Sequence, residues 1–178
     1  VPLPAKRGNI LSADGQVMAS SLPEYKIYMD YIAYDKDPDV AKELQHWRDS
    51  MLTEKLDSIA EGLHRIIPDR SVAFFKDRLK KGRKLKRRNW LLYGNRISYI
   101  QYKECKKLPL LKESPFKGGF YVEEQNQRKK PYGTLAARTL GAVFAGKDSA
   151  RYGLELSYDS VLRGKPGKSH RSKVRNKW

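Results

Sequence analysis

The sequence contains a single cysteine, few acidic residues and no long apolar run. Cys105 stands alone among 178 residues, which excludes an internal disulfide and any zinc site built from several cysteines, and leaves the redox compartment open. No uninterrupted apolar stretch approaches the ~18 residues of a membrane-spanning helix. Apolar residues make up 39% of the chain, which together with the high net charge favours an extended or partner-dependent molecule, whereas 11% aromatic residues argue against plain disorder.

Positive charge is what the chain has in excess, and it lies in two blocks. Lysine and arginine number 37 against 20 aspartate and glutamate residues, a formal net charge of +17. Residues 65–107 hold 15 basic and 3 acidic residues, and residues 163–178 hold 7 basic and none acidic. Such blocks suit the phosphates of a nucleic acid through counterion release. They suit an anionic membrane or polymer surface equally well, so charge alone leaves both readings open.

The spacing of apolar residues predicts a mixed α+β fold. At about 150 residues per domain, the length fits one large domain or two small ones. Helical spacing runs through Val40, Leu44 and Trp47, and again over residues 56–67, 72–79, 135–140 and 154–162. Strands are expected at residues 9–11, 17–19, 25–31, 90–93, 97–100 and 120–124. Pro68 should end the second helix and Asp69 should cap the third.

Motifs that would carry catalysis or bind a cofactor are incomplete. Residues 164–169 resemble a phosphate-binding loop, but that loop needs a glycine where this chain has Leu162. Glu123 and Glu124 are consecutive, so on a strand they point to opposite faces and do not share a proton. The histidines are too dispersed for metal-ligand spacing: they are His46, His64 and His170.

One serine lies in a partial catalytic motif. Ser114 and Lys117 fit the pattern S-x-x-K, in which one helical turn brings a lysine beside a nucleophilic serine. Gly118-Gly119 follows at once and weakens the helix, and the companion patterns S-x-N and K-T-G are absent. We therefore expect Ser114 to be a helix cap or a loop serine, and expect no catalytic, cofactor-binding or metal-binding residue in this chain.

Three other stretches carry non-catalytic motifs. Residues 7–19 read RGNILSADGQVMA, residues 128–136 read RKKPYGTLA, and residues 153–167 read GLELSYDSVLRGKPG. In this order they resemble R-G-x-I-x-D-R-N-G-x-x-L-A, R-x-Y-P-x-G-x-x-A and G-(L/I/V)-E-x-x-(Y/F)-x-x-x-L-x-G-x-x-G, the motifs of the amino-terminal pedestal, or dimerisation, domain of class B penicillin-binding proteins. The first departs at Ser12-Ala13 and has Asp14 for asparagine, and the second has Lys130 at a usual aromatic position.

The motif residues favour fold maintenance over ligand contact. Asp14-Gly15 suits a hairpin turn, Pro131 and Gly133 fix a bend, and Glu155 stands in the first turn of a helix, where the helix dipole favours a carboxylate. The full set of structural motif positions is Arg7, Gly8, Asp14, Gly15, Arg128, Pro131, Gly133, Gly153, Glu155, Tyr158, Leu162, Gly164 and Gly167. If the three motifs converge, Glu155 should lie within salt-bridge reach of Arg7 or Arg128.

The resemblance implies a non-catalytic scaffold on the extracytoplasmic, periplasmic face of the bacterial inner membrane. In the family, an amino-terminal helix anchors the protein. A carboxy-terminal transpeptidase domain carries the S-x-x-K serine that attacks D-Ala-D-Ala peptidoglycan stems and is acylated by penicillins. We expect this chain to be a fragment without either part, and its parent to be a penicillin-sensitive D,D-transpeptidase. Expected partners are that transpeptidase domain, a membrane glycan polymerase and division or elongation proteins; homodimerisation stays open.

The expected organisation is one pedestal domain over residues 1–178. Residues 1–34 and 116–170 would form a motif-bearing base whose terminal segments make a β layer. Residues 35–115 would form an inserted, helix-rich lobe, and residues 171–178 a basic tail that leads to the transpeptidase domain.

The alternative function is a basic nucleic-acid-binding module built on residues 65–107. In that reading, aromatic side chains beside the basic run would stack on bases. The candidates are Trp90, Tyr93, Tyr99 and Tyr102. In the pedestal reading, these aromatics belong to the core and the lysines and arginines are solvated.

Overall fold

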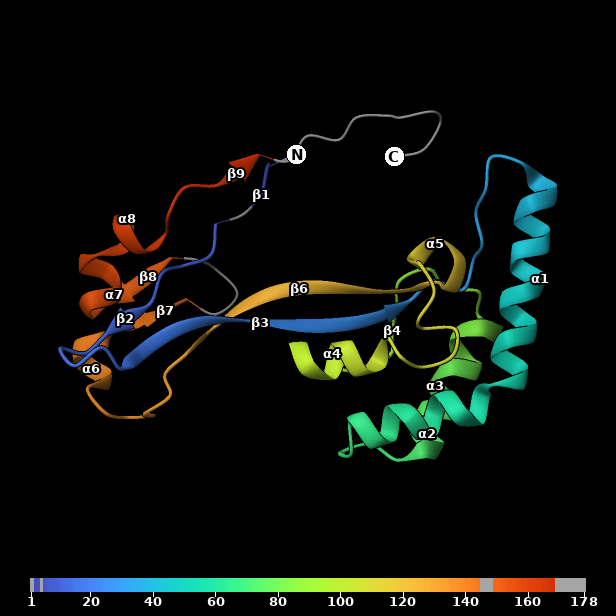
Figure 1. Cartoon of the computed structure of the whole chain (residues 1–178), viewed down its shortest axis with the longest axis horizontal. Coiled ribbons are helices and arrows are strands. Elements are labelled where there is room, and N and C mark those ends of the chain that lie inside the picture. The colour runs from blue at the N-terminus through green and yellow to red at the C-terminus, as the bar shows by residue number, and fades with distance from the viewer. Residues whose placement is uncertain (1, 4, 145–148, 169–178) are drawn as a thin grey trace. The chain divides into compact units, whose positions relative to one another are not determined.

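The computed structural model of the chain describes residues 2–3, 5–144 and 149–168. It divides the chain into two compact units, the first joining residues 1–22 to residues 126–178 and the second formed by residues 23–125. Two long paired strands, β3 (Val17–Met29) and β6 (Phe120–Lys129), contribute residues to both units (Figure 1). Helices and strands are mixed throughout, so the α+β class is confirmed.

The predicted division into base and lobe stays a prediction. It places the breaks after residues 34 and 115, whereas the compact units change over after residues 22 and 125, inside β3 and β6. The expected basic tail, residues 171–178, and His170 lie outside the described residues.

Three helices provide most of the second unit: α1 (Pro38–Glu54), α2 (Leu56–Ile66) and α3 (Val72–Lys84). Asp37 caps α1 by accepting a hydrogen bond from the backbone N–H of Asp39 at 3.0 Å, and Pro38 occupies the first turn, where its missing N–H costs nothing. The predicted cap Asp69 is wrong. Ser71 caps α3 instead, because its hydroxyl accepts from the backbone N–H of Phe74, and Asp69 accepts from the Tyr93 hydroxyl.

The buried face of α1 also differs from the prediction. Val40 is 45% exposed, and the buried residues of this helix are Arg48 and Leu52. The first two turns of α1 bury no side chain, so the face that meets the core begins only in the second half of the helix. By contrast α2 buries Ile59, Ala60 and Leu63 as expected.

Two short strands and two short helices complete the second unit. β4 (Trp90–Leu91) and β5 (Ile97–Ser98) both pair antiparallel with β3, in registers that include Met29 with Trp90 and Tyr25 with Ile97. The expected strand over 97–100 is wrong beyond Ser98. There a capping box of Ser98 and Gln101 starts α4 (Tyr99–Cys105), because the two side chains satisfy N–H groups that a strand would leave to a neighbour.

Ser114 is a helix cap, as expected. It accepts a hydrogen bond from the backbone N–H of Lys117 and begins α5 (Pro115–Gly118). Gly119, with φ of +80°, ends this single turn. The turn is therefore too short to build a nucleophile–lysine pair on a stable helix.

The apolar core lies within the second unit. The alternation Tyr25, Ile27, Met29 predicts its strand face, and these side chains are at most 6% exposed. Helices α2, α3 and α4 and the loop after α4 cover them with the following buried residues: Ile59, Ala60, Leu63, Ile67, Phe75, Leu79, Cys105, Leu108, Leu110 and Leu111.

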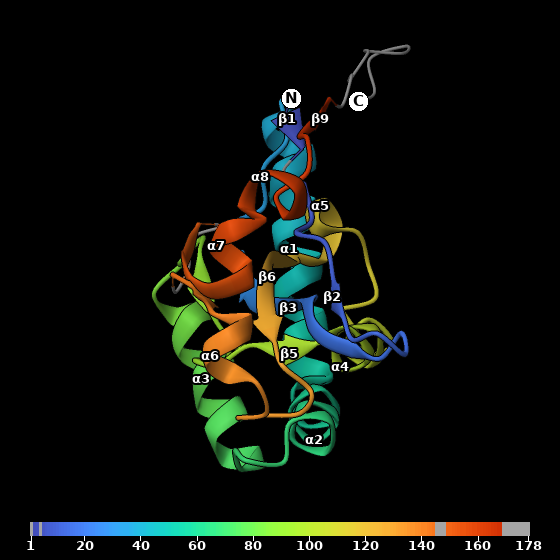
Figure 2. The ribbon, with the colours of Figure 1, turned by 90° about the vertical axis from the view of Figure 1, so that its left-hand side faces the viewer.

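The first unit consists of short elements (Figure 2). β1 (Pro2–Leu3) pairs with β9 (Gly167–Lys168), β2 (Ile10–Leu11) with the start of β3, and β7 (Ala142–Val143) with β8 (Ala150–Tyr152). Its helices are α6 (Ala137–Leu140), α7 (Gly153–Ser157) and α8 (Asp159–Leu162). Within the described ranges, no helix of either unit is both long and apolar enough to cross a bilayer.

The single helix predicted over residues 154–162 is wrong. The backbone breaks at Tyr158, with φ of −109° and ψ of 20°, and this break separates α7 from α8. The break changes which residues face inward: Tyr158 is 56% and Val161 74% exposed, whereas Glu155 and Leu162 are buried. The helix expected over residues 135–140 is shorter than predicted, because α6 starts only after Ala136.

Candidate functional site: a buried charge junction

One charged residue from each of the three motifs lies at a common site in the first unit. Nε of Arg7 lies 2.7 Å from Oε2 of Glu155, and Nε of Arg128 lies 2.7 Å from Oε1 of the same carboxylate. The side chains of Arg7, Arg128 and Glu155 are 3%, 6% and 0% exposed. The predicted ion pair is therefore present, and it involves both arginines rather than one. We call this cluster the charge junction.

Both guanidinium groups also bind backbone carbonyls. Nη2 of Arg7 donates to the carbonyl of Glu155 at 2.8 Å, and Nη1 of Arg128 donates to the carbonyl of Gly8 at 2.7 Å. The N–H of Gly8 in turn donates to the carbonyl of Leu162 at 2.7 Å. The junction thus ties together three backbone segments that are far apart in the sequence.

Local structure places each charge. Arg7 precedes β2, Arg128 lies near the end of β6, and Glu155 occupies the first turn of α7. The start of α7 is fixed by two glycines that cross closely: a Cβ on Gly141 would lie 1.7 Å from the carbonyl oxygen of Tyr152, and Gly141 and Gly153 both have positive φ. Only glycine combines this contact with this backbone conformation, so Gly153 sets the position of the carboxylate two residues later.

Asp159 belongs to the charge junction, although no motif position identified it. Its Oδ1 lies 2.7 Å from Nη1 of Arg7. The hydrogen bond from Arg7, together with the positive charges of Arg7 and Arg163, holds the pKa of Asp159 below its usual range. Its spacing of four residues from Glu155 was the available signal.

The charges of the junction stabilise one another. Burial by itself lowers the pKa of Arg7, but hydrogen bonds and charge interactions with Glu155 and Asp159 outweigh burial and raise it. Nη2 of Arg128 is buried without a hydrogen-bond partner among the described residues. Both carboxylate oxygens of Glu155 are occupied by guanidinium donors, so this carboxylate is arranged to hold segments together.

Other motif residues shape turns. Gly15 has φ of +82° within the turn closed by Ser12 and Gln16, and the Ser12 hydroxyl binds the carboxylate of Asp14. The N–H of Gly133 donates to the carbonyl of Lys130 at 3.1 Å, in the bend that contains Pro131.

The remaining motif residues lie in the last segment of the chain. Leu162 is buried, Tyr158 is exposed, Gly164 adopts φ of +66° next to Ala5, and Gly167 pairs with Leu3. The motifs therefore combine residues of the charge junction with residues that set the backbone conformation.

Other chemistry-bearing residues are accounted for by packing. No group of three or more histidine, cysteine, aspartate or glutamate side chains in the described part of the chain could hold a metal ion. Burial raises the pKa of the Cys105 thiol to about 12, which keeps it unreactive. His64 binds the carbonyl of Arg70.

The aromatics of the nucleic-acid alternative are partly covered. Tyr93 is 6% exposed, and the ring of Tyr102 stacks on Tyr25 at 5.0 Å between centroids. The guanidinium of Arg78 lies 4.3 Å from the ring centroid of Trp90. Tyr99, at 49% exposed, is the most accessible of the four candidates, so they do not form a row of free rings.

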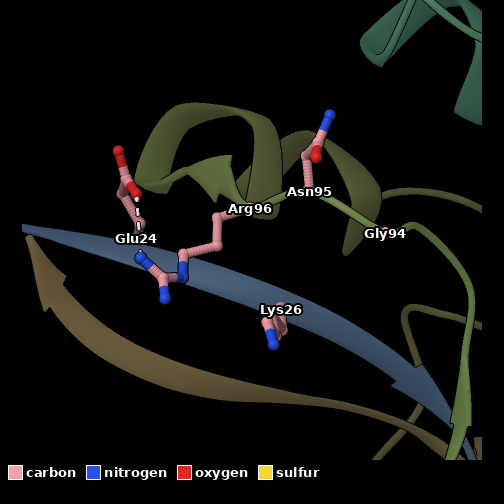
Figure 3. Close-up of a pocket in the computed structure, with 5 residues that line it drawn as sticks. All are labelled: Glu24, Lys26, Gly94, Asn95 and Arg96. Atoms are coloured by element: carbon pink, nitrogen blue, oxygen red, sulfur yellow. Dashed lines mark ion pairs between the residues drawn. The ribbon is translucent and has the colours of Figure 1, made fainter. Parts of the chain in front are cut away.

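The second unit also contains an open hollow of about 390 Å³, lined by Glu24, Lys26, Gly94, Asn95 and Arg96. Figure 3 shows Arg96 and Glu24 facing each other, with Nη1 and Oε2 3.8 Å apart. The lining contains no serine, threonine, cysteine or histidine.

The model of the penicillin-binding protein dimerisation domain matches residues 2–177. Comparison with curated proteins gives no significant match.

Among solved structures, penicillin-binding protein 2X from Streptococcus thermophilus is similar with a TM-score of 0.63 and 24% identity, over 99% of this chain and 25% of that chain. A peptidoglycan synthetase from Bifidobacterium adolescentis has a TM-score of 0.47 and 19% identity, over 93% of this chain and 29% of that one. A structure of a complex between penicillin-binding protein (PBP2) and MreC from Helicobacter pylori has a TM-score of 0.47 and 19% identity, over 94% of this chain and 30% of that chain. The chain thus spans about a quarter of the Streptococcus protein, and that likeness shows the fold.

Proposed function

This chain belongs to the family of penicillin-binding protein dimerisation domains, which are non-catalytic, and from that membership we propose that it is a pedestal that positions a transpeptidase domain for peptidoglycan cross-linking. The observation that carries the proposal is the buried charge junction. Arg7, Arg128 and Glu155 join segments that are 27 to 148 residues apart in the sequence. A domain that positions another needs such fixed internal geometry more than it needs a reactive group.

The chemistry of the junction suits positioning. A guanidinium and a carboxylate meet in a planar, directional arrangement, which an apolar contact does not impose. Desolvation of buried charges offsets much of their attraction, so the net stabilisation is small compared with the geometric definition. Arg7, Arg128 and Glu155 are therefore positioning residues, and the chain contributes no nucleophile.

The proposed setting is the extracytoplasmic face of the bacterial inner membrane. The parent protein would be anchored by an amino-terminal helix and would carry a penicillin-sensitive D,D-transpeptidase domain after the pedestal. Its partners would be that domain, a membrane glycan polymerase and proteins of division or elongation. Homodimerisation belongs to the same proposal and is testable by sedimentation of the chain.

A labelled β-lactam tests the absence of catalysis. The 178-residue chain, incubated with fluorescent penicillin, should form no covalent adduct, because Ser114 caps a single turn and its hydroxyl already accepts from the Lys117 backbone. A stoichiometric adduct on Ser114 would overturn the assignment.

The positioning role is tested in the parent protein. Glu155→Gln should leave acylation of the transpeptidase serine by penicillin within about twofold while cross-linking of peptidoglycan falls at least tenfold, since an intact catalytic domain would be misplaced. Glu123→Gln, which removes the same charge at an exposed position, is the matched control and should leave both unchanged. Equal cross-linking by the two variants would contradict the proposed role.

A further inference from the structure

Six cations at the end of α3 form an exposed patch in the second unit. We define the basic patch as Lys80, Lys81, Lys84, Lys86, Arg87 and Arg88, all of which are exposed. None of them forms an ion pair with any described residue. The sequence has no acidic residue between Asp77 and Glu104 that could neutralise them.

Other cations of the same helix are neutralised. Nζ of Lys76 lies 3.0 Å from Asp57 of α2, and Nε of Arg83 lies 2.8 Å from Asp49 of α1. These two cations lie on the side of α3 that meets α1 and α2. The chain therefore pairs the charges that face its own helices, and it leaves those of the basic patch without a counter-charge among the residues that the structure describes.

The helical part of the basic patch occupies one face. At about 100° per residue, Lys80, Lys81 and Lys84 fall within an arc of about 100°. The buried residues Phe75 and Leu79 project from the opposite side of the helix. These lysines consequently project into solvent together.

The helix dipole does not account for the whole patch. Lysines in the last turn of α3 are favoured by the negative end of that dipole, but the effect is confined to the last turn. Lys86, Arg87 and Arg88 come after the C-cap residue Leu85. Their charges add to those of the helix without any gain from its dipole.

An exposed apolar residue lies within this sequence of cations. Leu85 is 49% exposed, and it lies between Lys84 and Lys86 in the sequence. Cations around an exposed leucine are typical of surfaces that bind at a lipid interface, where phosphate groups take the charges and the acyl boundary takes the side chain. A soluble polyphosphate or a nucleic acid would use the cations and gain nothing from Leu85.

We propose that the basic patch, with Leu85 inside it, binds the anionic lipid headgroups of a bilayer surface. The charge complementarity is between lipid phosphates and six cations that form no ion pair within the described part of the chain. This contact would belong to residues 80–88 and would be separate from the anchor helix of the proposed parent protein. This proposal rests on the proposed function only because that function places the chain beside a bilayer.

Vesicle binding tests the proposal directly. The chain should co-float with phosphatidylcholine vesicles that contain roughly 30% phosphatidylglycerol and not with pure phosphatidylcholine, and binding should weaken as salt rises above ~0.1 M. The triple variant Lys80→Glu/Lys84→Glu/Arg87→Glu should bind at least ~50-fold more weakly, because each basic charge near an anionic surface contributes about fivefold.

A matched variant controls for net charge. Lys36→Glu/Lys42→Glu/Lys55→Glu changes the charge by the same amount at exposed positions of the same unit, and it should stay within about threefold of the unaltered chain. Equal losses in the two triple variants would overturn the proposal in favour of unspecific attraction. Neutralising substitutions to glutamine at Lys80, Lys84 and Arg87 keep the test valid if charge reversal disturbs folding.

Leu85 distinguishes a bilayer from other polyanions. Leu85→Ser should weaken vesicle binding about threefold to tenfold and leave binding to soluble polyphosphate or random oligonucleotides unchanged. Binding to oligonucleotides as tight as to vesicles, with no effect of Leu85→Ser on either, would identify a polyanion site and refute the lipid assignment. Failure of vesicle binding would leave the pedestal function standing, because penicillin acylation and cross-linking are measured without it.

Discussion

The two units bury different kinds of side chain. In residues 23–125 the buried side chains are apolar apart from Arg48, and they include Phe75, Phe120, Ile27 and Met29. In the described part of the other unit, the buried apolar side chains are Ala19, Leu140 and Leu162, and they share the interior with Arg7 and Glu155. The interior of one unit is therefore mainly apolar, whereas directional polar contacts form a larger share of the interior of the other.

This difference indicates a division of physical roles. Apolar burial contributes about 25 cal/mol per Å² and depends little on orientation, so it stabilises a unit without specifying fine geometry. Charge-assisted hydrogen bonds contribute less net free energy, but they are sensitive to distance and angle. The unit that carries the family motifs is the one whose interior specifies geometry.

The largest effect is expected from a cavity in the apolar unit. Phe75→Ala should lower the free energy of unfolding by ~3–5 kcal/mol, because Phe75 is fully buried in the core. Denaturant unfolding measures it, and hydrogen exchange should locate the loss in residues 23–125. Ile100→Ala, at a position 74% exposed, should change stability by less than ~0.5 kcal/mol. Similar losses from both variants would contradict the assignment of the core.

Removal of the junction carboxylate is expected to rank next. Glu155→Gln removes the carboxylate that two buried arginines share, and it should cost ~3 kcal/mol. Hydrogen exchange should show the loss in residues 1–22 and 126–168, with residues 23–125 still protected. Glu123→Gln, whose carboxylate is exposed and accepts from the Tyr28 hydroxyl at 3.1 Å, should lower the melting temperature much less. An equal loss of hydrogen-exchange protection in both units would contradict the proposed difference between their interiors.

A close approach in the apolar unit should have a smaller effect. A Cβ on Gly82 would lie 2.3 Å from Cε2 of Tyr31 and 2.6 Å from Cδ1 of Trp90, so Gly82→Ala forces two aromatic rings to move. The expected cost is ~1–3 kcal/mol by thermal unfolding. Gly94→Ala meets nothing within 4 Å and serves as the control. A stabilising effect of Gly82→Ala would show that helix propensity outweighs packing at this position.

The smallest expected effect is the loss, at low pH, of the stabilisation that Asp159 contributes. The pKa of Asp159 is lowered in the folded state by its hydrogen bond with Arg7, so its stabilisation is fully present above the unfolded pKa, near 4, and is lost as the pH falls through the lower folded value. Asp159→Asn should therefore cost less than ~1 kcal/mol at pH 7 and nothing near pH 2. A pH series of denaturant midpoints checks this. A cost that persists at pH 2 would assign the effect to packing.

Local patterns predicted much of the apolar unit. The alternation through Tyr25, Ile27 and Met29 and the helical spacing through Ile59 and Leu63 identify the buried faces, because one side of a regular element must carry the apolar residues. Predictions were wrong where a local competitor intervened. At Ser98 the capping box with Gln101 started a helix in a segment whose composition favoured a strand, and at Tyr158 a backbone break changed the phase of the expected helix.

The charge junction was predictable in part. The motifs identify Arg7, Arg128 and Glu155, one from each of three separated stretches. If these stretches converge, the carboxylate of Glu155 is expected to form an ion pair with one of the two arginines. Asp159 was not predicted, because its spacing of four residues from Glu155 was the available signal and its role depends on the position of Arg7 in the folded chain. The close crossing of Gly141 and Gly153 was equally invisible, since spacing along the chain does not state which backbones meet.

The sequence by itself determined the family, the α+β class, the excess of positive charge and the alternation that builds the core, because each of these follows from residue types and their spacing. Only the tertiary structure decided that one carboxylate serves two arginines, and that some cations of α3 are paired with α1 and α2 while those of the basic patch are paired with no described residue. The physical reason is the difference between neighbours in sequence and neighbours in space. Periodicity reports the environment of an element through its neighbours in sequence, whereas charge pairing acts over a few ångströms between atoms that only the folded chain brings together.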